Sequence, residues 1–577
     1  MIFQAAMRRN AIKIEGERSS SLGLARGRLV LISGFFVLAY MVLAVRAFDL
    51  TILQGELSQG GERTNGAEQA SVPAPGDILR ADIVDRNGVL LATTLETASL
   101  YADPRYISNP QVAAEGIVKI FPQLSFGDVL QKLQSDKRFV WIKRGITPDE
   151  QYKVLEIGEP GLSFRAEKKR IYPQGNLISH MLGYVDIDGH GQAGIERSFN
   201  KYLGYGDPLA LSLDVRLQHI LHREIEKTVK DFDALGGAGV IMDVTNGEIL
   251  AGVSLPDFDP HNPGAAKSSA IFNGLTLGVY ELGSVFKIFS TAALFETLNV
   301  PMSTTFDARE PIKIGRFTIS DYHAQDRVLT VPEVFMYSSN IGSAMMGQAV
   351  GTDALQGFYR DLGLLDPLDF EIKEVTKPLV PSPWGDVHTL TASYGHGIAT
   401  TPLQLVSAVS SIVNGGYLVK PTLVRTASED KGRSDVRVVS EQTAHRMRQL
   451  LRLVVTDGTG KKADVPGYHV GGKTGTAEKP GRTKKGYDHS RLLSSFVGVF
   501  PVDAPKYAIF IVIDEPKGTK ASFGYATAGW TAAPAVSRVI SSMVSVLGLA
   551  PVDQVASSPD FGSELKQFIS VKGRHEG

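Results

Sequence analysis

The stretch YELGSVFKIFS, residues 280–290, is almost entirely apolar, yet it places Lys287 three residues after Ser284. If this stretch turns into a helix, residues i and i+3 share one face, and the two side chains lie side by side. The apolar neighbours would remove water from the lysine amine and favour its neutral, basic form. The spacing therefore predicts a buried helix that carries a serine nucleophile and the lysine that takes its proton.

The Ser-x-x-Lys pattern alone is a weak signal, because three further matches lie in polar stretches: Ser198/Lys201, Ser428/Lys431 and Ser563/Lys566. What separates Ser284 from these serines is the set of motifs that follows it. The stretch MYSSNIG supplies Ser338 and Asn340, and the stretch GGKTGTAE supplies Lys473, Thr474, Gly475 and Thr476. The order of the three motifs along the chain strengthens the catalytic interpretation.

Each of these residue types suits acyl transfer. A second hydroxyl near a nucleophile can relay a proton, and an asparagine amide can hold a peptide. A Lys-Thr-Gly-Thr strand offers a cation, two hydroxyls and backbone amides, which together can bind a carboxylate beside an acyl group. Gly283, just before the nucleophile, suits a helix start whose N–H groups hold a developing oxyanion.

The stretch GYHVGGKT, residues 467–474, also fits the phosphate-loop pattern G-x-x-x-x-G-K-[ST]. Such a loop should follow a hydrophobic strand and open a helix. Gly475 and Pro480 follow closely, and both disfavour a helix there. The alternation of residues predicts a strand instead, so a nucleotide-binding function is disfavoured.

Length and composition indicate a multidomain globular protein. The chain has 577 residues, which is enough for two or three large cores. Its net charge of −1 gives no basic field for nucleic acid, and nucleic acid is not expected as a partner. The absence of cysteine excludes disulfides, thiol catalysis and cysteine metal sites.

An uncharged run near the N-terminus predicts a membrane anchor. Residues 29–45 carry no charge, lie between Arg28 and Arg46, and are at the short end of what spans a bilayer. Residues 47–48 extend the run if Arg46 snorkels, which gives a transmembrane helix over 29–48. Residues 1–28 hold most of the flanking positive charge and are expected in the cytoplasm. A cleaved signal peptide is the alternative, but its apolar region is usually shorter.

The remaining chain is expected to be α+β. A polar linker over 49–76 leads to an α+β region over 77–208, a larger domain over 209–550 and a polar, mobile tail over 551–577. Asn87-Gly88 and Asn246-Gly247 each predict a hairpin, and SSFVGVFP and KYAIFIVIDEP predict two adjacent strands. Hairpins at both ends of the larger domain predict an antiparallel sheet built from its chain ends, with helices packed around it.

These motifs together resemble those of class B penicillin-binding proteins, above all the division-specific peptidoglycan D,D-transpeptidases. The resemblance covers about residues 75–540 and includes RIYPQGNLISHMLGYVD, GQAGIERSFNKYL, YELGSVFK, YSSNIG and GGKTGTAE. Leu282 and Val285 stand where relatives often have Pro and Thr, and Ala81 replaces a common Gly. The resemblance implies a transmembrane helix, an elongated pedestal domain and a transpeptidase domain with a serine β-lactamase-like fold.

The resemblance also implies roles for the motif residues. Ser284 would attack the penultimate D-alanine of a stem peptide, and Lys287 would be the general base. Ser338 would shuttle a proton with Lys473, and Asn340 would orient the substrate. Thr474 and Thr476, with Gly475 between them, would bind the terminal carboxylate, and the N–H groups of Ser284 and Thr476 would form the oxyanion hole.

No metal or organic cofactor is implied. The implied partners are peptidoglycan stem peptides ending in D-Ala-D-Ala, β-lactams, a membrane glycosyltransferase and other division proteins. The implied location is the bacterial cytoplasmic (inner) membrane, with a single pass, a cytoplasmic N-terminus and a periplasmic catalytic domain.

Several alternatives stay open from the sequence. An elongation-type transpeptidase shares every catalytic motif, and a D,D-carboxypeptidase differs only in using water as acceptor. A penicillin sensor would need a larger cytoplasmic part, and a β-lactamase would need neither the anchor nor the first domain. RIYPQG is either a plain Pro-Gly turn or part of the pedestal. Three other candidates are interpreted as structural: His261 and the Asp321/His323 pair as loop residues, and YGHG as a helix entry near the site.

Overall fold

The computed structural model describes residues 79–570 except 316, 426–432, 482–485 and 552–560, together with a few positions between 34 and 41. The chain divides into two units, residues 1–74 and 75–577, and the described residues lie almost wholly in the second. The predicted transmembrane helix over 29–48 and the linker over 49–76 lie almost wholly outside the described residues. Among the residues that are described, no helix has the length and apolar character needed to cross a membrane.

The core of the larger domain is a five-stranded antiparallel sheet, as predicted. Its strand order is β14 (Gly471–Pro480), β15 (Tyr487–Phe500), β16 (Tyr507–Asp514), β6 (Gly236–Asp243) and β7 (Ile249–Leu255). Strand β16, from the end of the domain, pairs with β6 from its beginning, and Tyr507 lies opposite Asp243. The sheet therefore closes the domain by joining its two chain ends, and β14 is left at one edge.

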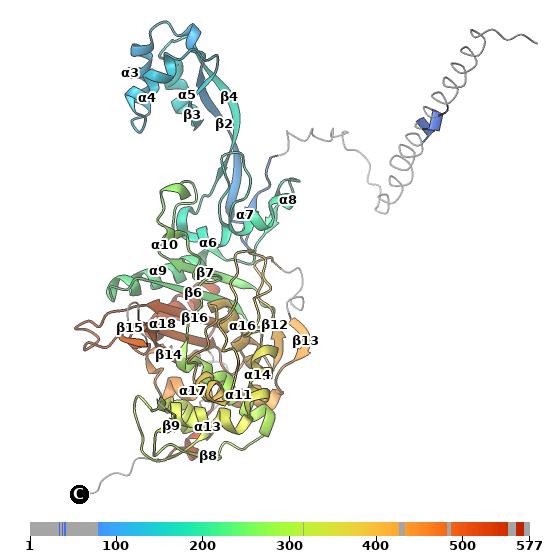
Figure 1. Ribbon diagram of the computed structural model, residues 1–577, viewed down its shortest axis with the longest axis vertical. Coiled ribbons are helices and arrows are strands. Elements are labelled where there is room, and N and C mark those ends of the chain that lie inside the picture. Colours follow the sequence, from blue (N-terminus) through green and yellow to red (C-terminus); the bar gives the residue numbers. More distant parts are fainter. Residues whose placement is uncertain are drawn as a thin grey trace, which may run out of the picture. The chain divides into compact units, whose positions relative to one another are not determined.

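Both faces of this sheet are covered by helices (Figure 1). Ile509 and Ile511 pack on one face with helices α9 (Val215–Asp231) and α18 (Ala532–Leu547). Phe510 and Val512 face the other way, toward α16 (Pro402–Val413). Because successive residues of a strand point to opposite faces, β16 must be apolar throughout to serve both cores.

The helical part of the domain surrounds α11 (Lys287–Leu298), which begins after a short 3-10 turn, η5 (Gly283–Phe286). Helix α11 is buried over most of its length, as expected of a central helix that is apolar all round, and ends where Asn299 adopts the left-handed conformation. Its surroundings include α12 (Val331–Tyr337), α13 (Asn340–Val350), α14 (Thr352–Asp361), α15 (Asp386–Ala392) and α17 (Glu441–Thr456). Short strand pairs complete the domain: β8 (Thr305–Asp307), β9 (Ile312–Ile314), β10 (Phe317–Ile319), β11 (Val328–Thr330), β12 (Tyr417–Val419) and β13 (Arg433–Arg437).

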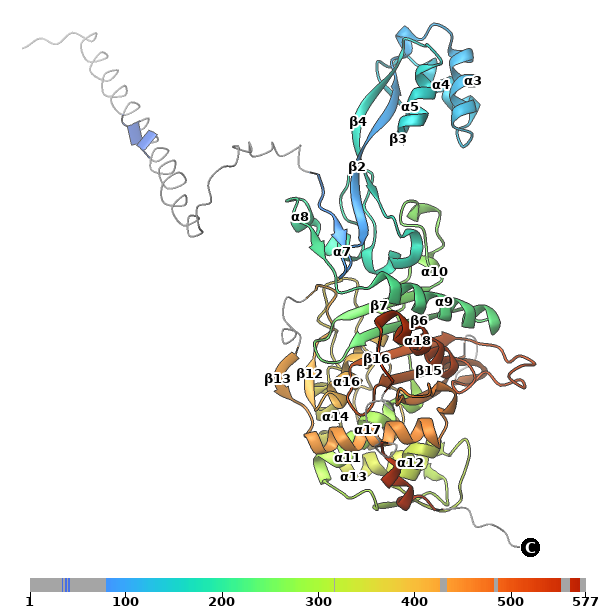
Figure 2. The same ribbon diagram turned by 180° about the vertical axis from the view of Figure 1, so that it is seen from behind.

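The N-terminal region, residues 79–208, has a smaller core of its own. Its elements are β1 (Ile83–Val84), β2 (Leu90–Ala102), β3 (Val140–Ile146), β4 (Leu162–Ile171), α3 (Pro110–Ile120), α4 (Phe126–Leu133), α5 (Pro148–Leu155), α6 (Ser179–Leu182), α7 (Gly194–Ser198) and α8 (Asn200–Leu203). Strand β2 pairs with β3 and β4, and α3, α4 and α5 pack against the far half of β2 (Figure 2). At the end of the N-terminal region that adjoins the larger domain, β1 pairs in parallel with β5 (Leu209–Ala210). Ile83 and Leu91 belong there to the same core cluster as Met242 of the central sheet.

Both predicted Asn-Gly turns are present. Gly88 and Gly247 have φ angles of +84° and +79°, which only glycine adopts without strain. An aspartate or asparagine side chain fixes each turn, since Asp85 accepts from Val89 N–H at 2.8 Å and Asn246 accepts from Glu248 N–H at 3.0 Å. The hairpins β1–β2 and β6–β7 are thereby confirmed.

Part of the predicted tail is packed against the larger domain. Residues 561–570 contain a 3-10 turn (Ser563–Phe568) in which Leu565 is buried. Thr330 donates to the Phe568 carbonyl at 2.8 Å, and Ser570 N–H donates to Glu333 at 2.7 Å. Polar composition alone did not indicate this packing, in which Phe561, Phe568 and Ile569 join Leu565 against the core of the larger domain.

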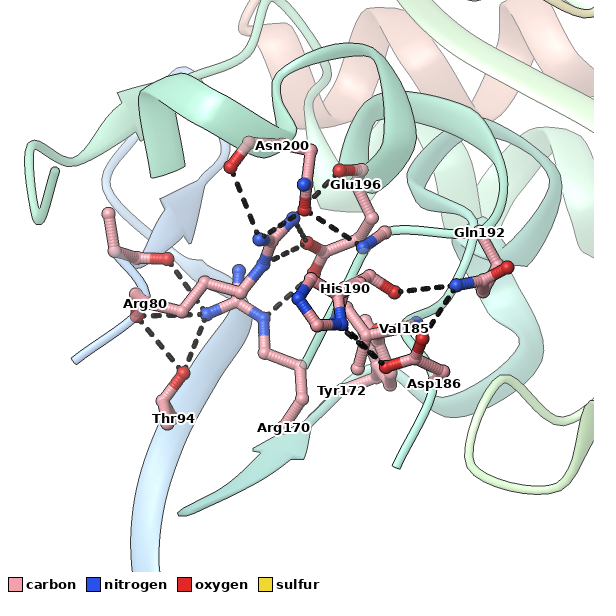
Figure 3. A network of polar contacts seen from close by, with 12 residues as sticks. Arg80, Thr94, Arg170, Tyr172, Val185, Asp186, His190, Gln192, Glu196 and Asn200 are labelled. Carbon is pink, nitrogen blue, oxygen red and sulfur yellow. Dashed lines mark hydrogen bonds and ion pairs between the residues drawn. The ribbon is translucent and has the colours of Figure 1, made fainter. Parts of the chain in front are cut away.

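A buried group of charges ties the base of the N-terminal region together (Figure 3). Glu196, fully buried, accepts from Arg80 Nε and from Arg170 Nε, both at 2.7 Å. Arg170 also donates to the Ala81 carbonyl at 2.8 Å, and Arg80 donates to Asn200 Oδ1 at 2.8 Å. The RIYPQG stretch that begins at Arg170 is thus more than a turn, because its arginine links β4 to α7 and to the segment just before β1.

Replacing Glu196 with Ala should destabilise the protein by about 3–5 kcal/mol, because two arginines would lose their shared carboxylate, one of them in a buried position. Urea unfolding followed by tryptophan fluorescence measures this, since Trp141 lies in the N-terminal region. The control is Glu226→Gln, which removes an exposed pair with Lys230 and should cost less than about 0.5 kcal/mol. Equal effects of the two substitutions would contradict a structural role for the buried group.

Candidate active site

Ser284 lies in the 3-10 turn that leads into α11, and Lys287 is the first residue of that helix. In a 3-10 turn, side chains at i and i+3 eclipse one another, so the serine and the lysine project from the same face. Ser284 is half-buried, whereas Val285, Phe286 and Lys287 are fully buried. The local sequence therefore leaves the hydroxyl within reach of a ligand while the amine stays in the protein.

The Lys287 amine is held by residues between α12 and α13. It donates to Ser338 Oγ at 3.1 Å, to Asn340 Oδ1 at 2.8 Å and to the Ser338 carbonyl. Among the contacts of the described residues there is no hydrogen bond between Lys287 Nζ and Ser284 Oγ. Ser284 and Lys287 thus lie on the same face of the turn, as the spacing predicts. The direct hydrogen-bond partners of the Lys287 amine, however, are Ser338 and Asn340.

Lys473, on strand β14, is a second lysine that contacts Ser338. Its amine donates to Ser338 Oγ at 2.8 Å and lies 5.7 Å from the centre of the Phe335 ring. Ser338 Oγ therefore bridges two buried lysines, one from α11 and one from β14. This bridge brings together residues that are 51 and 135 positions apart in the sequence.

Burial lowers the pKa of both amines. The pKa of Lys473 is lowered to about 7 by removal of water from the charged form. The pKa of Lys287 is lowered well below its usual value, first by burial and then by the nearby charge of Lys473, while Asp321 acts in the opposite direction. Amines in this state can accept a proton near neutral pH, which ordinary surface lysines cannot do.

The turn that carries Ser338 has an unusual backbone. Ser338 adopts a left-handed conformation with φ of 59°, and Asn340 then begins α13. Asp321 Oδ1 accepts from Asn340 N–H at 2.5 Å and from Ile341 N–H at 3.0 Å, and its Oδ2 accepts from Ser339 Oγ at 2.7 Å. Sequence reasoning treated Asp321 as a loop residue, and no short motif links it to a turn 18 residues away.

The Lys-Thr-Gly-Thr segment lies on the edge strand β14, directly against the turn that carries Ser284. A Cβ atom on Gly475 would come within 2.4 Å of the Leu282 carbonyl and 2.7 Å of a Val285 methyl. A Cβ atom on Gly283 would come within 3.0 Å of the Thr476 carbonyl. The two segments are therefore in close contact, with Gly475 against Leu282 and Gly283 against Thr476.

The threonines on either side of Gly475 are fixed by other segments. Thr474 shares a hydrogen bond of 2.6 Å with the Thr459 hydroxyl, which follows the end of α17. Thr476 Oγ1 accepts from Ala528 N–H at 3.2 Å. The sequence motifs did not single out Thr459, although DGTG precedes the lysine motif by only a few residues.

The YGHG stretch completes one wall of the site. It follows the end of α15 and does not enter a helix directly, and a Cβ atom on Gly395 would come within 2.1 Å of the Gly283 carbonyl. His396 stacks on Tyr394, and Tyr487 donates to Glu281 at 3.0 Å. Burial raises the pKa of Glu281.

The other candidate motifs do not form sites. Lys473 lies inside strand β14, so the phosphate-loop pattern of residues 467–474 has no helix to open. His261 Nε2 accepts from Tyr172 N–H at 3.0 Å, and within the described part of the chain no group of three or more His, Asp or Glu residues could hold a metal ion. His323 contacts the ring of Tyr322 and lies outside the lysine–serine network.

Comparison with protein families matches two parts of the chain. Residues 237–539 match the penicillin-binding protein transpeptidase domain, and residues 77–205 match the penicillin-binding protein dimerisation domain. The chain belongs to the penicillin-binding proteins. The family resemblance inferred from the sequence motifs is confirmed.

Relatives place this penicillin-binding protein within the family. It is 38% identical over 549 residues to the probable peptidoglycan D,D-transpeptidase FtsI of Caulobacter vibrioides, which covers 92% of this chain and 91% of the relative. It is 26% identical over 562 residues to the peptidoglycan D,D-transpeptidase FtsI of Escherichia coli K12, which covers 91% and 92%. These matches make it a class B penicillin-binding protein of the division-specific type.

A solved structure agrees with the fold. Penicillin-binding protein 3 from Mycobacterium tuberculosis, complexed with aztreonam, matches with a TM-score of 0.67 at 25% identity, over 84% of this chain and 98% of that one. The mixed α/β architecture with antiparallel sheets is therefore that of the penicillin-binding protein transpeptidases.

Replacing Gly475 with Ala should destabilise this penicillin-binding protein by about 1–3 kcal/mol, because the added methyl group meets a backbone carbonyl and the edge strand must shift. Gly357→Ala is the matched control, since it lies in α14 with no atom within 4 Å of the added Cβ. That control should be neutral or stabilising by up to about 1 kcal/mol. Denaturant unfolding measures both, and an unchanged midpoint for the Gly475 variant would contradict the tight packing of β14 on the Ser284 turn.

Proposed function

We propose that this protein is a serine-type D,D-transpeptidase that crosslinks peptidoglycan stem peptides during septal wall synthesis. The observation that carries the proposal is the pair of buried lysines that share the Ser338 hydroxyl beside the Ser284 turn. The FtsI relatives, named as peptidoglycan D,D-transpeptidases, support the substrate class.

Acylation begins with transfer of the Ser284 proton to the neutral Lys287 amine. The serine oxygen attacks the carbonyl carbon of the penultimate D-alanine, and the carbonyl oxygen becomes an oxyanion. The N–H groups of Ser284 and Thr476, whose segments are in backbone contact, stabilise that charge. Ser338 relays a proton to the departing nitrogen, with Lys473 as the second amine on its hydroxyl, and terminal D-alanine leaves.

Substrate binding uses the edge of the central sheet. Strand β14 pairs with β15 on one side only, so its other edge can bind an extended peptide. Thr474 and Thr476, with Gly475 between them, bind the terminal carboxylate, and Asn340 orients the peptide amide. An alanine at position 475 would displace both threonines, which is why the motif needs a residue without a side chain there.

The acyl-enzyme is then resolved by an amine of a neighbouring stem peptide. The amine attacks the ester carbonyl, its proton passes to the basic site, and the Ser284 hydroxyl is regenerated as the new peptide bond forms. β-Lactams acylate the same serine, and the solved relatives in complex with aztreonam and ampicillin support this expectation. The reaction needs no metal or organic cofactor.

The remaining parts of the chain are proposed to position this domain at the membrane. We assign residues 1–28 to the cytoplasm, 29–48 to a single transmembrane helix, 49–76 to a linker, 77–208 to an elongated pedestal, 209–550 to the transpeptidase domain and 551–577 to the C-terminal segment. The uncharged run with its basic N-terminal flank supports a periplasmic catalytic domain. Glycan polymerisation is left to a membrane glycosyltransferase, one of several expected division partners.

Ser284→Ala should abolish covalent labelling by fluorescent penicillin, because Ser284 is the proposed nucleophile and the Ser338 hydroxyl is already held between Lys287 and Lys473. Gel fluorescence of isolated membranes measures the label, and Ser198→Ala, in another Ser-x-x-Lys match, should label like the parent. The labelled parent should sediment with membranes and become soluble when residues 1–48 are removed. Persistent label on the Ser284 variant would refute the assignment of the nucleophile.

Acylation by penicillin should be fast near neutral pH and slow down as pH falls, because a protonated Lys287 amine cannot accept the serine proton and burial holds the pKa of that amine well below its usual value. Lys287→Met should slow acylation by roughly 10²–10⁴-fold near neutral pH, as expected for loss of a general base. Rates from pH 5.5 to 9 measure both effects. The exposed Lys230→Met variant is the control, and near-parental acylation by the Lys287 variant would remove its role as base.

A further inference from the structure

The turn that supplies the partners of Lys287 is held by one carboxylate from outside the three sequence motifs. Asp321 follows strand β10, and its two oxygens accept from Asn340 N–H, Ile341 N–H and the Ser339 hydroxyl at 2.5, 3.0 and 2.7 Å. The preceding residue adds a further bond, since the Ser320 carbonyl accepts from Asn340 Nδ2 at 2.9 Å. The Asn340 amide is thus fixed at both ends, with Lys287 on its oxygen and Ser320 on its nitrogen.

The hydrogen bonds of Asp321 lie next to Ser338, whose backbone conformation is strained. Ser338 has a left-handed φ of 59°, which costs a non-glycine residue roughly 1–2 kcal/mol. The conformation turns both the Ser338 carbonyl and its hydroxyl toward Lys287 Nζ. A carboxylate that binds the next three residues, at the start of α13, favours this turn over a relaxed one.

We propose that Asp321 is a positioning residue of the acylation step, which fixes the Ser338–Asn340 turn on the Lys287 amine and acts on that amine through its charge. The inference rests on the proposed function, since it concerns the base that activates Ser284. Asp321 does not touch the substrate and works through Ser339, Asn340 and Ile341.

The charges around Lys287 define how this influence can be measured. The groups that affect the Lys287 amine are Lys473, which lowers its pKa, and Asp321, which raises it. Its direct partners, Ser338 and Asn340, are uncharged. Removing the negative charge of Asp321 should therefore lower the pKa of Lys287 further and move the rising limb of the acylation profile to lower pH.

The experiment uses the full-length protein, with fluorescent penicillin as the probe and the acylation rate measured from pH 5.5 to 9. Asp321→Asn should reduce the rate at the alkaline plateau by roughly tenfold, because hydrogen bonds to a charged group are lost, and should shift the midpoint to lower pH. Asp326→Asn is the matched control, since it removes an exposed carboxylate of the same loop at a positive φ that asparagine tolerates.

A second variant separates position from charge. Asp321→Glu keeps the charge but moves the carboxylate, so its plateau should fall while its midpoint stays near that of the parent. Parental rates and midpoint in Asp321→Asn would overturn the proposal, and so would a lower rate in that variant with an unmoved midpoint, which indicates a purely structural role. Acylation of the parent and of the Asp326 variant, with Ser284→Ala unlabelled, shows that the assignment of Ser284 as the acylated nucleophile holds whichever result is found.

Discussion

The candidate active site depends on one hydroxyl shared by two buried amines. Ser338 Oγ accepts from both Lys287 and Lys473, and neither amine is in contact with a carboxylate. Burial lowers the pKa of both amines, and the nearby charge of Lys473 lowers that of Lys287 further. Every larger feature of the domain serves to bring these three side chains together from distant parts of the chain.

The fold achieves this with three elements that each constrain the next. Helix α11 is buried and presents Lys287 at its first turn, the α12–α13 junction closes over the amine, and β14 delivers Lys473 from the sheet edge. The contact of Gly475 with Leu282 and Val285 fixes the distance between sheet and helix. Because β14 is an edge strand, the same geometry leaves backbone groups available to a peptide beside Ser284.

Sequence reasoning reached the parts of this site that short-range patterns encode. Motif spacing identified Ser284, Ser338 and Lys473, and Asn-Gly pairs located both hairpins, because glycine turns and helical offsets are local properties. The sequence did not reveal Asp321 or Thr459, whose roles arise from contacts between segments that only the fold brings together. The packing of residues 561–570 was missed for the same reason, since one buried leucine carries no periodic signal.

The protein handles buried charge in two opposite ways. In the N-terminal region, Arg80 and Arg170 are paired with one carboxylate, since Glu196 lies against both, and the Ala81 carbonyl accepts a further hydrogen bond from Arg170. In the larger domain, Lys287 and Lys473 have only hydroxyl, amide and carbonyl partners, so burial lowers their pKa values. Arginine suits the first setting because it stays charged, and lysine suits the second because it can become neutral. The buried cluster built on arginine therefore suits a structural role, and the buried cluster built on lysine suits proton transfer.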